Sequence, residues 1–238
     1  MRKLNQLKIK IFADCADLDS ILELYQNPYI KGFTTNPTLM RKSGILDYEK
    51  FSRQLIEKIA DRPIALEVIS DEFSEMERQA HKIATWGKNV YVKIPVTNTR
   101  RESSAKLVRR LANDGIKLNV TALMTNDQVR VASEALRDIV PAYISVFGGR
   151  IADTGRDPVP QLKEAVEIMS AYPNQELIWA SPRELLNIFQ ADEIGCHIIT
   201  VTHDILKKLT LVGKDLSEYS FDTVKMFYND AIQAGYKL

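Results

Sequence analysis

The 238-residue sequence has few cysteines, no long apolar run and almost no net charge, and each absence excludes a class of protein. Its two cysteines, Cys15 and Cys196, lie far apart, and a chain of this length needs no disulfide, so we expect a reduced, cytoplasmic protein. No apolar stretch approaches the roughly 20 residues that span a bilayer, and the first residues lack the apolar stretch of a secretory signal. The net charge of +1 gives no overall attraction to nucleic acid or to an anionic membrane.

Signatures of cofactor and metal sites are also missing. The sequence has no glycine-rich phosphate loop and no dinucleotide-binding fingerprint. Its three histidines, His81, His197 and His203, show no metal-ligand spacing with cysteine or carboxylate residues. We expect His203 to begin a helix, although a contact with a ligand is also open. The sequence therefore predicts no metal and no cofactor.

What the sequence does contain is a regular alternation of apolar runs and amphipathic stretches. Eight runs are almost continuously apolar, as in parallel strands covered on both faces: 8–13, 30–34, 64–69, 90–96, 117–123, 143–147, 176–180 and 197–201. Helical patterns follow them at 18–25, 48–59, 72–86, 104–113, 127–136, 161–171, 183–189 and 205–209. Eight consecutive β/α units predict an α/β protein with one domain over residues 1–238, a closed (β/α)8 barrel. An open doubly wound sheet is the second choice, but it would usually need a glycine-rich first turn.

A further helix is predicted near the C-terminus, within residues 217–238. Its apolar stripe contains Phe221, Val224, Tyr228, Ala231 and Ile232. Such a stripe either covers the end of the barrel or packs on a neighbouring subunit, and the sequence supports both interpretations equally. We predict association through this helix, and hence a homo-oligomer.

Lys93 is the most informative single residue, because it lies in the apolar segment Tyr91–Val96. Removing an ammonium group from water costs roughly several kcal/mol unless the charge is paired or neutralised. A lysine in such a place often serves as a neutral amine that attacks a carbonyl carbon and forms a Schiff base. From this segment alone, a lysine whose head group reaches solvent is equally well supported.

The working face of a (β/α)8 barrel lies at the C-terminal ends of its strands, and polar residues of this sequence gather there. One of them is Glu67, a carboxylate within an apolar strand beside the strand of Lys93. This arrangement is expected for acid–base chemistry, although a structural ion pair is also open. Arg150 and Arg183 follow neighbouring strands and, with the Ser181 hydroxyl, suit a phosphate group. The residues therefore predict a class I aldol reaction on a sugar phosphate.

Six motifs, in order along nearly the whole chain, resemble the transaldolase family, which also contains fructose-6-phosphate aldolases. They are Ile11-Phe12-Ala13-Asp14, Gly32–Leu39, Val92–Thr97, Asn119-Val120-Thr121, Ser145–Ile151 and Ala180–Arg183. The resemblance implies transfer of a dihydroxyacetone unit from sedoheptulose 7-phosphate or fructose 6-phosphate to an aldose phosphate, through a lysine Schiff base.

The resemblance also implies a role for each residue. Lys93 would form the imine, and Asp14 would exchange a proton with the substrate hydroxyl. Glu67 and Thr121 would hold a water molecule that relays protons. The implied substrate contacts are Thr34, Asn36, Asn119, Ser145, Phe147, Arg150, Ser181 and Arg183, of which the two arginines and Ser181 would hold the phosphate.

Two positions favour transfer over release of dihydroxyacetone. Transaldolases have Glu at the position of Glu67 and tend to have Phe at that of Phe147, where the aldolase branch has Gln and Tyr. The chain departs from the family where Val146 replaces a proline and where Gly148-Gly149 predicts a looser turn before Arg150. A charge in the segment 154–158 could also reach the site.

These departures leave the acceptor sugar open, and with it the pentose phosphate pathway as the setting. An aldolase acting on fructose 6-phosphate is one alternative. A barrel that binds a sugar phosphate without turnover is another, but it would not need Asp14, Glu67 and Lys93 together.

Overall fold

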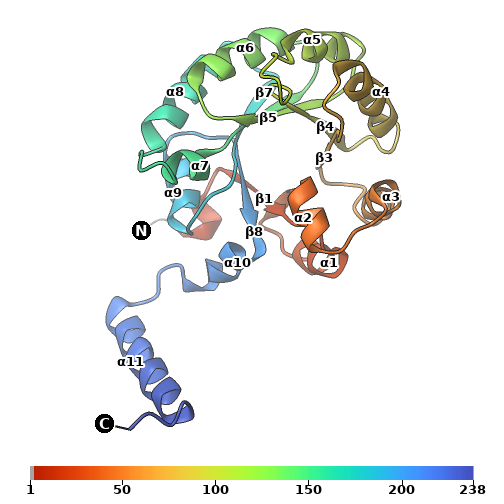
Figure 1. Ribbon diagram of the computed structural model, residues 1–238. Helices are drawn as coiled ribbons and strands as arrows, with labels where there is room; N and C mark the ends of the chain where they lie inside the picture. Colours follow the sequence, from red (N-terminus) through yellow and green to blue (C-terminus); the bar gives the residue numbers. More distant parts are fainter. Residues whose placement is uncertain (1–2, 238) are drawn as a thin grey trace.

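The computed structural model describes residues 3–237, and its eight strands close into one parallel barrel (Figure 1). The strands are β1 (Lys10–Asp14), β2 (Ile30–Thr34), β3 (Ile64–Glu67), β4 (Val90–Pro95), β5 (Leu118–Leu123), β6 (Ala142–Val146), β7 (Gln175–Trp179) and β8 (Ile198–Thr202). Each strand pairs with the next in sequence, and β8 pairs with β1 to close the ring. The predicted (β/α)8 barrel is therefore confirmed, and the open sheet is excluded.

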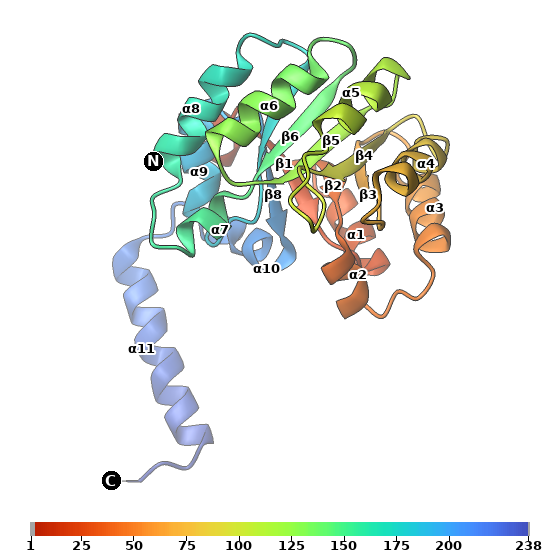
Figure 2. The ribbon, with the colours of Figure 1, turned by 45° about the horizontal axis from the view of Figure 1, so that its top comes forward.

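Helices surround this barrel (Figure 2). Those that match the predicted pattern are α1 (Leu18–Tyr25), α3 (Tyr48–Lys58), α4 (Phe73–Ala84), α5 (Ala105–Asn113), α6 (Asn126–Leu136), α8 (Val159–Met169), α9 (Leu186–Glu193) and α10 (His203–Leu206). His203 begins α10, as expected. Short elements that were not predicted are η1 (Leu4–Gln6), α2 (Pro37–Lys42) and α7 (Gly148–Ala152). The helical stretch predicted at 205–209 is divided between α10 and the 3-10 helix η2 (Lys207–Leu211).

The inside of the barrel is closed at one level by an apolar plug. Successive side chains of a strand point to opposite faces, so every second residue of each strand points inward. Phe12, Tyr143, Ile178 and Ile198 form one buried cluster, and Tyr91 stacks on Tyr143 with ring centroids 4.0 Å apart. The polar residues of the barrel interior lie directly beyond this cluster, toward the C-terminal ends of the strands.

Two residues beyond the plug, the same strands carry polar side chains. They are Asp14 on β1, Lys93 on β4, Ser145 on β6 and Thr200 on β8. On β2 the plug level is occupied by Gly32, where a Cβ atom would lie 2.5 Å from the ring of Phe12. Glycine at this position therefore makes room for the phenyl ring of Phe12.

The outward side chains of the strands pack against the helices. Leu66, Val92 and Ile144 are 0% exposed and belong to one continuous core with helix residues such as Leu55 and Leu111. Burying a side chain of this size stabilises the fold by about 1.5–3 kcal/mol. The barrel wall is thus rigidly held from outside, which keeps the inward polar residues in place.

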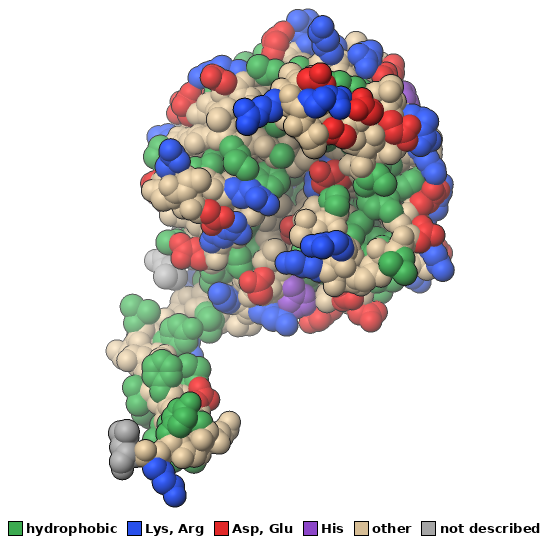
Figure 3. All heavy atoms as spheres, viewed as in Figure 1, with side chains coloured by type: hydrophobic (Ala, Val, Ile, Leu, Met, Phe, Trp, Pro, Cys, Tyr) green, Lys and Arg blue, Asp and Glu red, His purple; other side chains and the backbone are tan. Residues whose placement is uncertain are grey.

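The C-terminal helix α11 (Leu216–Gln233) extends away from the barrel, and none of its residues is buried (Figures 1 and 2). Its apolar side chains are visible along the helix in Figure 3; Phe227 is 64% exposed and Ile232 63%. The interpretation that this helix covers the end of its own barrel is therefore wrong. Within residues 3–237, no helix has both the length and the apolar character needed to cross a membrane.

Candidate active site

A cavity of about 460 Å³ opens at the C-terminal ends of the strands. All twelve residues predicted from the sequence line it: Asp14, Thr34, Asn36, Glu67, Lys93, Asn119, Thr121, Ser145, Phe147, Arg150, Ser181 and Arg183. The fold thus brings together residues that are separated by up to most of the chain length.

Lys93 is buried, with 6% of the residue exposed, so its head group does not reach bulk solvent. Strand register places Glu67 of β3 directly beside it. The Nζ atom lies 2.9 Å from Glu67 Oε2 and donates a hydrogen bond of 2.7 Å to the backbone carbonyl of Thr35. A buried amine in contact with a carboxylate has a partner that can receive its proton, which a nucleophilic amine requires.

Asp14 stands at the end of β1. Burial raises the pKa of its carboxyl group above the usual value, and the positive charge of Lys93 partly offsets this increase. The Thr34 hydroxyl donates to Oδ1 at 2.8 Å, and the Asn36 amide donates to Oδ2 at 3.5 Å, both favouring the ionised form. The negative charge of Glu67 acts in the opposite direction. Asp14 is therefore anchored, and it is poised to take up a proton more readily than an exposed aspartate.

Asn36 is a helix cap rather than only a turn residue. Its Oδ1 accepts a hydrogen bond of 3.0 Å from the backbone N–H of Leu39, and Pro37 follows in the first turn of α2. Proline is well suited to this position because the first helical N–H groups have no partner within the helix. With Oδ1 engaged by the helix, the amide group of Asn36 is directed to Asp14.

On the β5 and β6 side, buried polar atoms face the cavity. The Ser145 hydroxyl donates to Asn119 Oδ1 at 2.8 Å. Among the described residues, Asn119 Nδ2 and Thr121 Oγ1 are buried without a hydrogen-bond partner. Unpaired buried polar groups are costly, so these atoms are suited to bind hydroxyl groups of a ligand.

The two arginines predicted to bind the phosphate differ in their surroundings. The Arg183 guanidinium contacts Asp153 through two of its nitrogens, with Nε donating to Oδ1 at 2.9 Å. These bonds lower the pKa of Asp153. The Arg150 guanidinium lies over the ring of Phe147, 5.7 Å from its centroid. One of the two cavity arginines is therefore held by an acidic residue, Asp153, which does not itself line the cavity and which the sequence did not reveal.

The segment before Arg150 is tightly packed, so the expected looser turn is wrong. A Cβ atom on Gly149 would lie 1.5 Å from the carbonyl oxygen of Ser181, and one on Gly148 would lie 2.6 Å from Trp179 Nε1. Glycine is needed here because the β6 and β7 loops approach at backbone level. The charge expected from the segment 154–158 is Arg156, which bonds to the Thr154 hydroxyl and does not line the cavity.

Sequence reasoning missed Thr200 and Asp153. Thr200 lines the cavity, and its hydroxyl lies 2.5 Å from that of Thr34. It stands two residues after Ile198 of the plug, so the alternation along β8 could have identified it. Asp153 follows α7, a helix that was not predicted, and no pattern in the sequence marks it.

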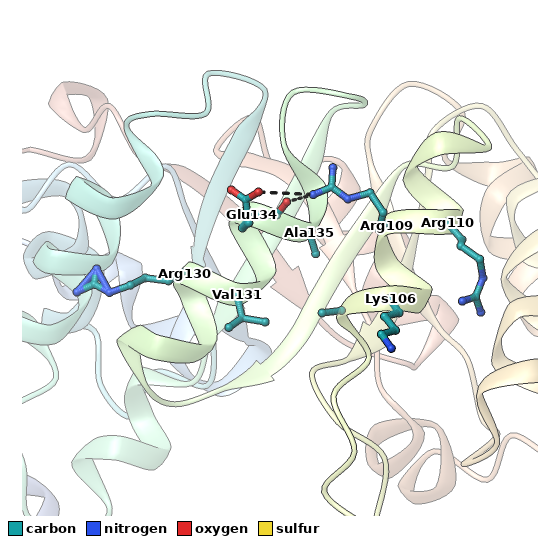
Figure 4. Close-up of a pocket in the computed structure, with 8 residues that line it drawn as sticks. Lys106, Arg109, Arg110, Arg130, Val131, Glu134 and Ala135 are labelled. Atoms are coloured by element: carbon teal, nitrogen blue, oxygen red, sulfur yellow. Dashed lines mark hydrogen bonds and ion pairs between the residues drawn. The ribbon is translucent and has the colours of Figure 1, made fainter.

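A larger groove of about 750 Å³ lies between α5 and α6 (Figure 4). Its arginines already have partners. Arg109 donates to the backbone carbonyl of Glu134 and lies 4.0 Å from its carboxylate, while Arg110 and Arg130 pair with Glu77 and Glu164. Nowhere in the described part of the chain do three or more His, Cys, Asp or Glu side chains gather as a metal site would require.

The sequence profile of a family described as transaldolase/fructose-6-phosphate aldolase matches residues 11–237. The chain belongs to this family. A probable transaldolase of Thermoanaerobacter sp. (strain X514) is 35% identical over 231 residues, which cover 97% of this chain and all of that protein. A probable transaldolase of Methanococcus maripaludis (strain C5) is 34% identical over 84% of this chain and 89% of that protein.

The fold is also found in more distant structures. The crystal structure of 2,3-dimethylmalate lyase superposes with a TM-score of 0.57 at 11% identity, covering 98% of this chain and 86% of that protein. At this level of identity the likeness concerns the barrel alone. The transaldolase/fructose-6-phosphate aldolase family is therefore assigned from the sequence matches, and this chain is an enzyme of that class.

Proposed function

We propose that this enzyme transfers a dihydroxyacetone unit from a ketose phosphate, sedoheptulose 7-phosphate or fructose 6-phosphate, to an aldose phosphate through a Schiff base on Lys93. The observation that carries the proposal is the buried Lys93 amine, 2.9 Å from Glu67, in the cavity that also holds Asp14. Loss of a proton to Glu67, directly or through water, would leave the amine free to attack the ketose carbonyl carbon. Loss of water from the adduct would then form the imine.

Carbon–carbon cleavage follows from the imine. Asp14 would accept the proton of the hydroxyl on the carbon of the breaking bond that lies farther from the imine, and that carbon would become the aldehyde of the leaving aldose. The bonding electrons would move into the imine and leave an enamine on Lys93. An acceptor aldehyde would be attacked by the enamine, with Asp14 returning its proton to the new hydroxyl. The raised pKa of Asp14 supports this double role.

The remaining polar groups would hold the substrate. Asn119 Nδ2 and Thr121 Oγ1, both buried without a partner among residues 3–237, are placed to bind hydroxyl groups or the relaying water. At the other end, the bonds of Arg183 to Asp153 use Nε and Nη2, so the remaining Nη1 would meet a phosphate together with Arg150 and Ser181. If this is correct, Arg183→Ala will reduce the preference for phosphorylated over unphosphorylated ketoses.

Transfer is favoured over simple aldol cleavage by two residues of the cavity. Glu67 stands where the aldolase branch has glutamine, and Phe147 has no hydroxyl group to assist release of the three-carbon unit. Product formation from fructose 6-phosphate that requires an added aldose phosphate supports transfer. Release of dihydroxyacetone without an acceptor would support the aldolase reaction.

Trapping tests the central step. The enzyme is incubated with fructose 6-phosphate and borohydride, and the reduced adduct is located by mass spectrometry. An adduct on Lys93 is expected, because borohydride reduces an imine to a stable secondary amine. Absence of the adduct under turnover conditions would contradict the Schiff-base mechanism and leave sugar-phosphate binding without turnover as the alternative.

The cellular location, the metabolic pathway and the oligomeric state are part of the same proposal. We place the enzyme in the cytoplasm and in the pentose phosphate pathway, which is consistent with two free cysteines, Cys15 and Cys196. We also propose a homo-oligomer in which α11 packs on a second copy. Its large apolar side chains Phe221, Val224, Phe227, Tyr228 and Ile232 are each more than half exposed, and a face of this kind is usually covered by a partner.

A further inference from the structure

The hydroxyl groups of Thr34 and Thr200 form a buried chain that ends at Asp14. Thr34 is 4% exposed and Thr200 6% exposed, so bulk water does not compete for their hydrogen bonds. The Thr34 hydroxyl lies 2.8 Å from Asp14 Oδ1 and 2.5 Å from the Thr200 hydroxyl. The chain thus links β8, β2 and β1, and its only ionisable member is the proposed general base.

The direction of these hydrogen bonds follows from the number of protons available. An ionised carboxylate can only accept, and a threonine hydroxyl has one proton to donate. When Asp14 is ionised, Thr34 must give its proton to Asp14, so Thr200 must donate to the oxygen of Thr34. No proton of Thr34 is then left for the substrate, so the substrate contact predicted for Thr34 could only be one in which its oxygen accepts a hydrogen bond.

We propose that Thr200 is a positioning residue that, through the hydroxyl of Thr34, holds the Asp14 carboxylate in the orientation needed to exchange a proton with the substrate. The inference rests on the proposed function, in which Asp14 is the acid–base group. When Asp14 is protonated, the chain can reverse, with Asp14 donating to Thr34 and Thr34 to Thr200. The carboxyl group keeps its anchor in both protonation states.

Removing the Thr200 hydroxyl should weaken the bond from Thr34 to the carboxylate, because each donor in such a chain strengthens the next. The ionised form of Asp14 then loses stabilisation, and its pKa rises further. The other titratable groups coupled to Asp14 are Lys93, Glu67 and Cys15. None of them contacts the Thr200 hydroxyl in a hydrogen bond found among residues 3–237, so we expect their effect on Asp14 to be the same in the variant.

The test measures kcat/KM against pH for transfer from fructose 6-phosphate to an added aldose phosphate by wild type, Thr200→Val and Thr200→Ser. Because the base must be ionised, activity falls as pH drops through its pKa. We expect Thr200→Val to lower kcat/KM about 3- to 10-fold, which is the effect of losing one hydrogen bond. We also expect the acid limb, the fall of kcat/KM at the acidic end of the pH profile, to move to higher pH. Thr200→Ser keeps a hydroxyl, so its kcat/KM and the pH of its acid limb should match those of the wild type.

Thr202→Val is the matched control, since the hydroxyl of Thr202 bonds to Asp204 rather than to Thr34; its acid limb should not move. Borohydride trapping on Lys93 should be unchanged in Thr200→Val. An unshifted acid limb in Thr200→Val, with trapping intact, would overturn the role of Thr200. Failure of trapping in the wild type would instead overturn the proposed function.

Discussion

Apolar side chains of similar size are buried in the barrel but exposed on the C-terminal helix. In the barrel, Leu66 and Ile144 are 0% exposed, whereas Phe227 and Ile232 of α11 are more than 60% exposed. Strands and helices of the barrel follow one another in the chain, so each apolar face meets a partner from an adjacent unit. Helix α11 comes after the ring has closed, and it leaves the barrel instead of packing on it (Figure 1).

The proposed chemistry therefore belongs to the barrel, and the proposed association of subunits belongs to α11. The barrel contains both the core and the whole candidate site, so changes in it should alter activity or folding. Changes in α11 should alter the number of subunits and leave the barrel intact.

The largest effect is expected at Lys93. Lys93→Arg keeps a positive charge beside Glu67, but a guanidinium does not form an imine. We expect kcat to fall by at least about 10³-fold, with circular dichroism and molecular mass unchanged. Lys82→Arg, on the surface of α4, is the control and should retain activity. Activity of Lys93→Arg within tenfold of wild type would show that the amine is not the nucleophile.

A smaller effect, on stability, is expected from Gly149→Ala. The new Cβ would lie 1.5 Å from the Ser181 carbonyl oxygen, so the β6 and β7 loops must separate. We expect a loss of about 1–3 kcal/mol in the free energy of unfolding, measured by denaturant titration. Gly155→Ala is the control: its φ is positive but no atom lies within 4 Å, so a loss of about 1 kcal/mol is expected. Equal losses would indicate that the loop contact is not rigid.

On the other side of the comparison, Phe227→Asp should break the assembly. A buried phenylalanine contributes about 1.5–3 kcal/mol, so its replacement by a charge should weaken association at least tenfold. Light scattering should show a shift to the mass of one chain, while the thermal transition of the barrel changes little. Asn229→Asp, on the polar side of α11, should leave the mass unchanged. A single-chain mass for the wild type would remove the assembly from the proposal.

The smallest effect concerns the pH dependence of stability. Because burial raises the pKa of Asp14, the folded protein still binds a proton at pH values where an aspartate of the unfolded chain has already released it. Asp14 therefore costs stability as pH rises through this window. Asp14→Asn should melt at a higher temperature than wild type at pH 7, and the difference should shrink towards pH 4. A difference that is constant with pH would contradict the raised pKa.

Much of the barrel could be predicted because its signals are local. Apolar runs of strand length, alternating with helical periodicity, specify eight units, and strand alternation puts Asp14, Lys93 and Ser145 on the inner face. Helices α2 and α7 were missed because they are short and begin at Asn36-Pro37 and at Gly148-Gly149, sequences that are typical of turns.

The sequence by itself determined the barrel, the position of Lys93 at the C-terminal ends of the strands, and twelve of the residues that line the cavity. Only the tertiary structure decided which groups touch, such as Thr200 behind Thr34 and Asp153 on Arg183, and that the apolar face of α11 stays exposed. The physical reason is the distance along the chain over which each kind of signal acts. Periodicity along the chain fixes the direction of a side chain, whereas hydrogen bonds and uncovered faces depend on atoms brought together from distant segments.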